Sequence, residues 1–341
     1  MPRTGGHASR RRRSDGTVRD VTVRLTVRTA IWRTHVARMV GAVDGLVPVV
    51  KGNGYGFGRD RIAHLAAEFS DTVAIGTVHE LDGIPDDVHA VVLTPVLDAS
   101  MGHADTAALI AHHDPILTVS NLEHVAVLER AGWTGRAVVK LATTMQRYGV
   151  APGESRSLVA AVRGAGVDVV GVSMHPPLAG SAQDHVDEIV AALAHIDRDL
   201  PVWLSHLDLD DYAALPASHT YRLRLGTKLW HGDKAALHLS ADVIEIRPVR
   251  AGERAGYRLG EIPTDGHLVM IGAGTSNGIT PLPDGRSPFH FQRTRLALHE
   301  SLHMHTAMAF VPDGDPLPEQ GDRVDVQRAL HMTTVDEFEW L

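Results

Sequence analysis

The 341-residue chain contains no cysteine, which excludes disulfide bonds, thiolate zinc sites and cysteine nucleophiles. It also lacks any run near the roughly 18 apolar residues that a membrane span needs, so no membrane partner is expected. The first twenty residues are locally basic, with arginines at Arg10–Arg13, but lack the apolar stretch of a signal peptide. We therefore expect a disordered basic tail at residues 1–20 and a cytoplasmic protein.

Strong charge of one sign is absent as well. The formal net charge is -8, which is mild for this length, so a nucleic-acid partner is not expected. Hydrophobic residues make up 44% and charged residues 22%, a mixture typical of a globular protein with a sizeable core. Since a barrel domain alone takes about 200 to 250 residues, this length predicts one large domain and one smaller domain.

Short apolar runs alternate with helix-like stretches from Val21 to about Gly232, as in a parallel sheet built from strand–helix units. A helix over Thr29–Val43 is expected to precede the first strand. Apolar residues that recur at three and four positions predict further helices at Arg61–Phe69, Asn121–Ala131, Arg156–Gly164 and His185–Ile196. Eight runs qualify as strands: Leu46–Val50, Thr72–Val78, His89–Val96, Pro115–Val119, Ala137–Leu141, Asp168–Met174, Pro201–Ser205 and Tyr221–Leu225.

This count predicts an α/β protein with an eight-stranded (β/α)8 TIM-like barrel over residues 21–235. After Gly232 the strand-like runs are broken by glycine and proline and show no clear helical period. Examples are Asp242–Val249, His267–Gly272 and Arg323–Gln327. A smaller, mostly-β C-terminal domain is therefore expected over residues 236–341.

Reactive side chains stand at the ends of several predicted strands, where barrels of this kind build their active sites. Each of them alone is compatible with a hydrogen-bonded structural group. Their convergence on one rim of the barrel instead predicts a functional site. The residues are Lys51, Lys140, Arg147, His175, His206 and Arg224, the last followed by Gly226 and Thr227.

Lys51 directly follows the apolar run Val47–Val50 and precedes glycines at alternate positions in 52–58. Glycine lets the backbone turn tightly and lets a ligand approach it closely. A lysine in an apolar place must pair, shift its pKa or react, and a desolvated lysine can be the amine of a Schiff base. A structural salt bridge, or a glycine loop that merely turns, is the alternative. Nucleotide binding is disfavoured because neither GxxxxGK[ST] nor a strand-linked GxGxxG with a distal acid is present.

Residues 49–58, VVKGNGYGFG, resemble the cofactor motif of the alanine racemase family, usually written VVKANAYGHG. Residues 140–149, KLATTMQRYG, resemble the family's KxDTGMxRxG. Residues 224–232, RLGTKLWHG, resemble its RxGxxxYG with one residue inserted, and Gly256–Arg258 loosely resembles its SYG. The four motifs agree in order and approximate spacing, so the resemblance extends from about Val21 to Val326.

The resemblance implies an isomerase that uses pyridoxal phosphate to interconvert L- and D-amino acids, alanine or a related one, as for a peptidoglycan precursor. Lys51 would hold the cofactor and act as base on one face of the substrate Cα. Tyr257, from the partner subunit, would serve the other face, because inversion requires a base on each side. The resemblance thus implies a homodimer whose active sites are shared between subunits, with a small amino acid as substrate.

The family also implies roles for the other residues of the rim. Tyr55 would hold a phosphate oxygen, and Arg224 would face the pyridine nitrogen with His175 behind it. An arginine cannot accept the pyridine proton, so the ring stays a weaker electron sink, which favours simple proton exchange. The full set of implied cofactor-binding residues is Lys51, Tyr55, Arg147, His175, His206, Arg224, Gly226 and Thr227.

On the substrate side, Arg147 would support the cofactor's ring oxygen and the substrate carboxylate with its planar fork of donors. Met304 matches the middle residue of the family's CMD and would bring a backbone N–H near that carboxylate. Lys140 corresponds to a lysine that can be carbamylated in relatives and then orients the arginine.

Several departures from the family pattern concern the substrate. Residues 271–278 read IGAGTSNG where relatives usually have IGYADG, which removes a tyrosine from the entrance to the substrate pocket. Ala142 replaces an aspartate, and His305 replaces the aspartate of CMD. A wider or differently polar substrate pocket is therefore expected.

Three alternatives stay open. One keeps pyridoxal phosphate but has an altered substrate or a non-catalytic binding role, and a second is a decarboxylase, which Arg224 disfavours because related decarboxylases carry an acid there. The third is a barrel metallohydrolase, suggested by 22 histidines and the HxH at His303–His305. Those enzymes need HxH on an early barrel strand, so no metal is expected.

Overall fold

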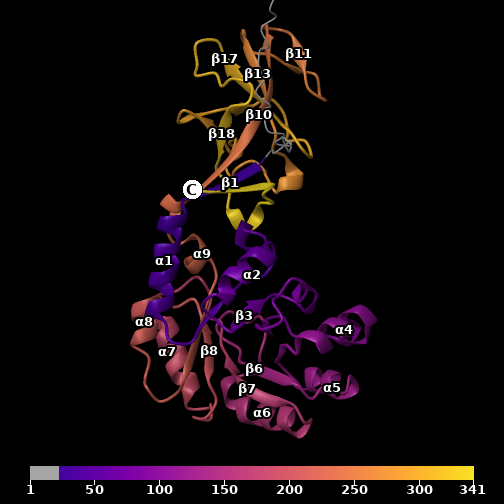
Figure 1. Cartoon of the computed structure of the whole chain (residues 1–341), viewed down its shortest axis with the longest axis vertical. Helices are drawn as coiled ribbons and strands as arrows, with labels where there is room; N and C mark the ends of the chain where they lie inside the picture. The colour runs from indigo at the N-terminus through magenta and orange to yellow at the C-terminus, as the bar shows by residue number, and fades with distance from the viewer. Residues whose placement is uncertain (1–22) are drawn as a thin grey trace, which may run out of the picture.

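The computed structural model describes residues 23–341, so the basic tail expected at residues 1–20 lies outside the described residues. Eight parallel strands form one sheet, and Val50 N–H donates to the Ala74 carbonyl at 2.8 Å, which brings its two end strands together and closes the barrel. The predicted barrel is confirmed (Figure 1). Its strands are β2 (Leu46–Pro48), β3 (Thr72–Ile75), β4 (His89–Val92), β5 (Ile116–Val119), β6 (Arg136–Lys140), β7 (Asp168–Ser173), β8 (Val202–Ser205) and β9 (Tyr221–Leu225).

Helices follow the strands and cover the outside of the barrel (Figure 1). They form where apolar residues repeat with helical spacing, and their starts carry caps: the Asn121 side chain accepts a hydrogen bond from the His124 N–H at 2.9 Å. Within the described residues, no helix is long and apolar enough to cross a membrane. The longer helices are α1 (Thr29–Ala42), α2 (Arg59–Ala67), α4 (Ala104–His113), α5 (Leu122–Arg130), α6 (Ser155–Gly164) and α7 (Ala182–Leu193), and the short ones are α3 (Asp98–Gly102), α8 (Leu209–Ala213) and α9 (Thr227–His231).

The strands of the barrel are buried on both faces, which explains why they read as continuous apolar runs rather than as alternating ones. One buried cluster gathers a residue from each of several strands, including Val47, Ala74 and Val138, and fills the inside of the barrel. The main core lies between the strands and the helices and includes Leu117 and Val172. This packing fixes the strand ends from which the polar rim projects.

A second, mostly antiparallel sheet is built largely from the chain after the barrel and lies above the barrel in Figure 1. The mostly-β character expected for this part is confirmed. The strand β1 (Val23–Val27) pairs with β10 and β19, so the segment before α1 belongs to this sheet, while the division at residues 21–235 and 236–341 stays a prediction. Besides β1, the strands of this sheet are β10 (Leu237–Val249), β13 (Gly266–Ile271), β14 (Phe289–Phe291), β15 (Thr294–Arg295), β16 (Ala297–Leu298), β17 (Ala307–Pro312), β18 (Arg323–Val326) and β19 (Glu337–Trp340). A separate two-stranded hairpin is formed by β11 (Arg254–Ala255) and β12 (Gly260–Glu261).

The second sheet supports the loop that follows β2. Asn53 Nδ2 donates to the carbonyl of Thr333 at 2.8 Å and to that of Leu330 at 3.3 Å. The ring of Trp340 lies 5.5 Å from the ring of Trp32 and 6.3 Å from that of Phe57. The C-terminal strand therefore packs directly onto the elements that hold Lys51 in place.

Candidate active site

The loop at residues 51–58 owes its shape to its glycines. Four glycines and Tyr55 have positive φ angles there, between 56° and 90°. A Cβ added at Gly56 would lie 2.7 Å from the Leu330 carbonyl oxygen, so only glycine lets the loop pack this closely. The alternating glycines therefore serve to turn the chain sharply beside Lys51, as the sequence predicts.

A pocket of about 610 Å³ opens at the carboxyl ends of the strands. Its volume suits a small molecule or cofactor, since ligand pockets occupy about 300 to 1,000 Å³. All of the predicted cofactor-binding residues except Arg147 line it. These are Lys51, Tyr55, His175, His206, Arg224, Gly226 and Thr227, and they are joined by Ser205, Asp208 and Lys228.

Arg224 is buried at the base of this rim and is held by backbone carbonyls. Its Nη2 donates to Met174 at 2.6 Å and to Trp203 at 3.3 Å, and its Nε donates to Leu204 at 3.3 Å. Burial and the charge of Arg147 lower the pKa of Arg224 to about 10, which leaves it charged at neutral pH. Among residues 23–341, Arg224 pairs with no carboxylate, and a guanidinium of fixed orientation is suited to an electron-rich ligand atom.

The rings of His175 and His206 lie against each other beside Arg224, with centroids 4.3 Å apart and planes tilted by 54°. His206 Nδ1 donates to the Pro176 carbonyl at 2.8 Å, which fixes its ring orientation. Burial, followed by the charge of Arg224, lowers the pKa of His175 to about 2. Both rings are therefore available as neutral hydrogen-bonding groups rather than as cations.

The two lysines of the rim lie in a cationic environment. Burial and the charge of Arg147 lower the pKa of Lys51, while Glu80 opposes the shift. Lys140 is buried, and burial and then Arg224 hold its pKa well below the usual value. Lowered pKa values increase the neutral amine fraction, which is the form that attacks a carbonyl or takes a proton.

One end of the pocket presents donors suited to an anion. The Tyr55 hydroxyl lies so close to Gly226 that a Cβ there would collide with it. Burial raises the pKa of Tyr55 to about 12, so the hydroxyl stays protonated and can donate. Within residues 23–341, the N–H groups of Gly226 and Thr227 donate to no protein acceptor. Hydroxyl and free N–H donors of this kind are the usual ligands of a phosphate.

Arg147 lies beside this pocket rather than in its wall. It lines a neighbouring cavity of about 560 Å³ together with Ser120 and His124. Its charge nevertheless lowers the pKa of both Lys51 and Arg224, so it faces the same rim. Its role toward cofactor and substrate stays a prediction.

Tyr257 lies in the turn between β11 and β12, Met304 lies in the connection from β16 to β17, and neither lines the pocket of Lys51. They are 85% and 66% exposed, an unusual state for large apolar side chains at neighbouring positions. The ring of Tyr257 lies 4.5 Å from that of His303. One chain by itself therefore does not bring the predicted second base to Lys51.

The structure adds Glu80, an acidic group that the sequence motifs do not include. Glu80 accepts hydrogen bonds from the N–H groups of Gly76 at 2.7 Å and Gly52 at 3.2 Å, and so faces the amine of Lys51. Lys228 pairs with Asp208 at the pocket edge. Glu80 follows β3 at the reactive rim, and this position could have identified it from the sequence.

Comparisons with known proteins agree with this geometry. The family model described as "Alanine racemase, N-terminal domain" matches residues 30–222. The chain is 27% identical to the alanine racemase of Corynebacterium efficiens over 287 residues, covering 76% of each protein. It is 26% identical to that of Mycobacterium tuberculosis over 276 residues, covering 71% of this chain and 69% of the relative.

Solved structures show the same fold. An alanine racemase from Bartonella henselae with covalently bound pyridoxal phosphate superposes with a TM-score of 0.71 at 16% identity, covering 94% of this chain and 99% of that one. The biosynthetic alanine racemase from Pseudomonas aeruginosa gives a TM-score of 0.70 at 18% identity, with the same coverage.

Proposed function

Because the chain belongs to the alanine racemase family, we propose that it is a pyridoxal-phosphate-dependent amino-acid racemase, an isomerase that interconverts L- and D-amino acids. One observation carries the proposal. The amine of Lys51 opens into a pocket that combines a buried, fixed Arg224 with free donors at Tyr55, Gly226 and Thr227.

These residues fit the cofactor group by group. The Lys51 amine suits its aldehyde, the donors of Tyr55, Gly226 and Thr227 suit its phosphate, and Arg224 suits its pyridine nitrogen. When bound, pyridoxal phosphate supplies an electron sink that makes the Cα proton of an amino acid removable. The neutral rings of His175 and His206 would pack beside Arg224 and keep it in place.

Arg224 also bears on the type of reaction. A guanidinium offers donors alone, so it cannot take up a proton from a ring nitrogen, whereas a carboxylic acid could share one. Its three backbone carbonyl partners leave it no freedom to turn away. This arrangement favours proton exchange at Cα, and we propose racemisation over decarboxylation for that reason.

Inversion at Cα needs a proton acceptor on one face and a donor on the other. We assign these roles to Lys51 and Tyr257. Lys51 has a lowered pKa, which suits it to accept a proton near neutral pH. Tyr257 is exposed in the turn between β11 and β12, so it would reach the pocket of another copy of the chain. A homodimer with shared active sites follows from this assignment.

The substrate is alanine or a related amino acid in this proposal. Its carboxylate would be met by the guanidinium of Arg147 and by a backbone N–H near Met304. Residues 271–278 lie against the Met304 segment, since Ser276 N–H donates to the Met304 carbonyl at 2.9 Å. The absence of a tyrosine in this stretch favours a substrate somewhat larger than alanine.

Lys140 is suited to carbamylation, which consumes a neutral amine. Burial, followed by the charges of Arg224 and Arg147, holds its pKa well below the usual value. A carbamate there would place a negative charge near the guanidinium groups of Arg224 and Arg147. We propose that this modification orients Arg147, and that the enzyme supplies D-amino acids for peptidoglycan in the cytoplasm.

The direct test is a substrate panel. The purified protein, saturated with pyridoxal phosphate, is incubated with single L-amino acids, and the products are separated by chiral chromatography. The D-enantiomer of alanine or of a related amino acid should form. Pyridoxal phosphate bound without any D-product would favour the non-catalytic alternative, and release of carbon dioxide would favour the decarboxylase.

A further inference from the structure

Two histidines end helix α4, far along the barrel from the pocket of Lys51. His112 and His113 close the helix, and Asp114, in the left-handed conformation, stops it just before β5. Asp86 lies in the connection that leads into β4. Both segments precede their strands, so they meet at the amino-terminal end of the barrel, opposite the reactive rim.

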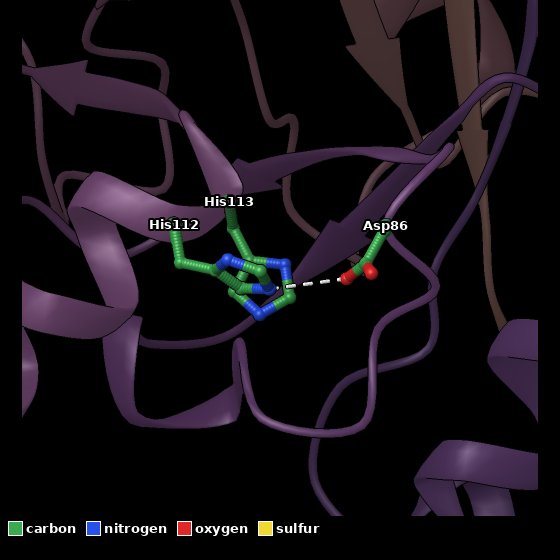
Figure 2. Close-up of side chains that lie close together, drawn as sticks. All are labelled: Asp86, His112 and His113. Atoms are coloured by element: carbon green, nitrogen blue, oxygen red, sulfur yellow. Dashed lines mark hydrogen bonds and ion pairs between the residues drawn. The ribbon is translucent and has the colours of Figure 1, made fainter.

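The three side chains converge in space (Figure 2). His112 Nε2 lies 3.1 Å from Asp86 Oδ1, and the rings of His112 and His113 lie 4.7 Å apart at 77°. One nitrogen or oxygen atom from each of the three residues falls within 4.8 Å of the others. Among residues 23–341, no other group of three histidine or acidic side chains meets this condition.

The ion pair between His112 and Asp86 does not by itself explain why the three side chains converge. The side chains of His112 and Asp86 are 62% and 81% exposed, and exposed pairs contribute little to stability. The three donor atoms lie together at the carboxyl end of α4, where the helix dipole favours a cation.

From this geometry we propose that Asp86, His112 and His113 form a Zn²⁺ site with a fourth position open to water. Imidazole and carboxylate are donors that Zn²⁺ takes in tetrahedral sites at about 2.0–2.2 Å, so small side-chain rotations bring the three atoms into range. The same donor set disfavours Mg²⁺, which prefers oxygen ligands alone.

The site is structural because of its position. It joins the end of α4 to the connection before β4, and so closes a chain loop of which Asp86 and His112 are the ends. Clips of this kind stabilise a fold by restricting the unfolded chain. The ion would lie away from the reactive rim, so racemisation does not depend on it.

Zinc titration of the full-length protein, purified with its cofactor and stripped of free metal by dialysis, tests the proposal. Calorimetry should show one equivalent of Zn²⁺ more for the wild type than for the His112→Ala/His113→Ala double variant. Asp86→Asn should raise the Kd for that Zn²⁺ ion roughly tenfold or more, and tenfold corresponds to about 1.4 kcal/mol. Zn²⁺ should raise the melting temperature of the wild type more than that of the double variant. Added Mg²⁺ should not displace the bound Zn²⁺.

His103→Ala is the matched control, because this exposed histidine precedes the same helix and takes no part in the cluster. It should bind Zn²⁺ as the wild type does. Equal Zn²⁺ binding by the wild type and the double variant overturns the proposal. A loss of Zn²⁺ binding in His103→Ala as large as that in the double variant overturns it as well. If the double variant does not fold, the comparison of Asp86→Asn with wild type decides in the same way.

Discussion

His303 Nε2 donates a hydrogen bond of 2.7 Å to Glu300 Oε1, behind the proposed base Tyr257. The Glu300 side chain is only 7% exposed and also accepts from the Tyr257 N–H at 3.2 Å. A Cβ at Gly256 would lie 2.5 Å from that carboxylate, so glycine is needed there. The carboxylate thus fixes both the backbone that carries Tyr257 and the ring that packs on it.

Glu300→Ala should lower kcat of racemisation about tenfold, because hydrogen bonds to a charged group contribute about 1.5–3 kcal/mol and their loss lets Tyr257 move. KM should change little. Steady-state kinetics measures both. Glu261→Ala, at an exposed position of the β11–β12 hairpin that carries Tyr257, should keep wild-type kcat. A Glu300→Ala enzyme as fast as that control would show that the carboxylate does not position Tyr257.

The same carboxylate predicts a pH dependence of stability. Burial raises the pKa of Glu300, but hydrogen bonds from His303 and from the N–H groups of Tyr257 and Arg258 outweigh it, so the net pKa lies below the usual 4.5. Stability from a depressed carboxylate pKa is present above the unfolded value and is lost as the pH falls through the folded value. The free energy of unfolding measured in urea should therefore fall less steeply in Glu300→Gln than in wild type as the pH decreases below about 4.5. Parallel curves would contradict this.

The pKa of Lys51 should shift in opposite directions when the charge of one or the other of its two charged neighbours is removed. Arg147 lowers its pKa and Glu80 raises it. Removal of the positive charge in Arg147→Gln should therefore move the pH midpoint of pyridoxal phosphate binding upward, and Glu80→Gln should move it downward. Binding rates of the cofactor-free protein across a pH series give the midpoints. Shifts of the same sign in both variants would exclude this electrostatic account.

Arg224→Met should destabilise the fold by about 3 kcal/mol, because three backbone carbonyls lose their buried charged donor. Urea denaturation measures the change in the free energy of unfolding. Arg198→Met removes an exposed arginine and should change it by less than about 0.5 kcal/mol. Equal effects of the two substitutions would show that the carbonyl contacts of Arg224 contribute nothing.

The barrel was predictable because its strands are buried on both faces and so appear as apolar runs, and the glycines after Lys51 mark a turn that only glycine permits. The pairing of β1 was not predictable, since its partners β10 and β19 come more than 200 residues later in the chain. Local patterns carry no information on such pairing. The same holds for Glu300, whose role depends on a contact with Gly256 of the β11–β12 hairpin that only the folded chain creates.

Proton exchange at Cα in deuterated water tests the two-base assignment most directly. Each enantiomer of the preferred amino acid is incubated separately with wild type and with Tyr257→Phe, and deuterium incorporation and inversion are followed by NMR and chiral chromatography. Wild type should incorporate deuterium from both enantiomers and invert both. Tyr257→Phe should retain exchange from one enantiomer only, with inversion lost. Inversion by Tyr257→Phe at the wild-type rate would contradict the assignment of Lys51 and Tyr257 to opposite faces of the substrate.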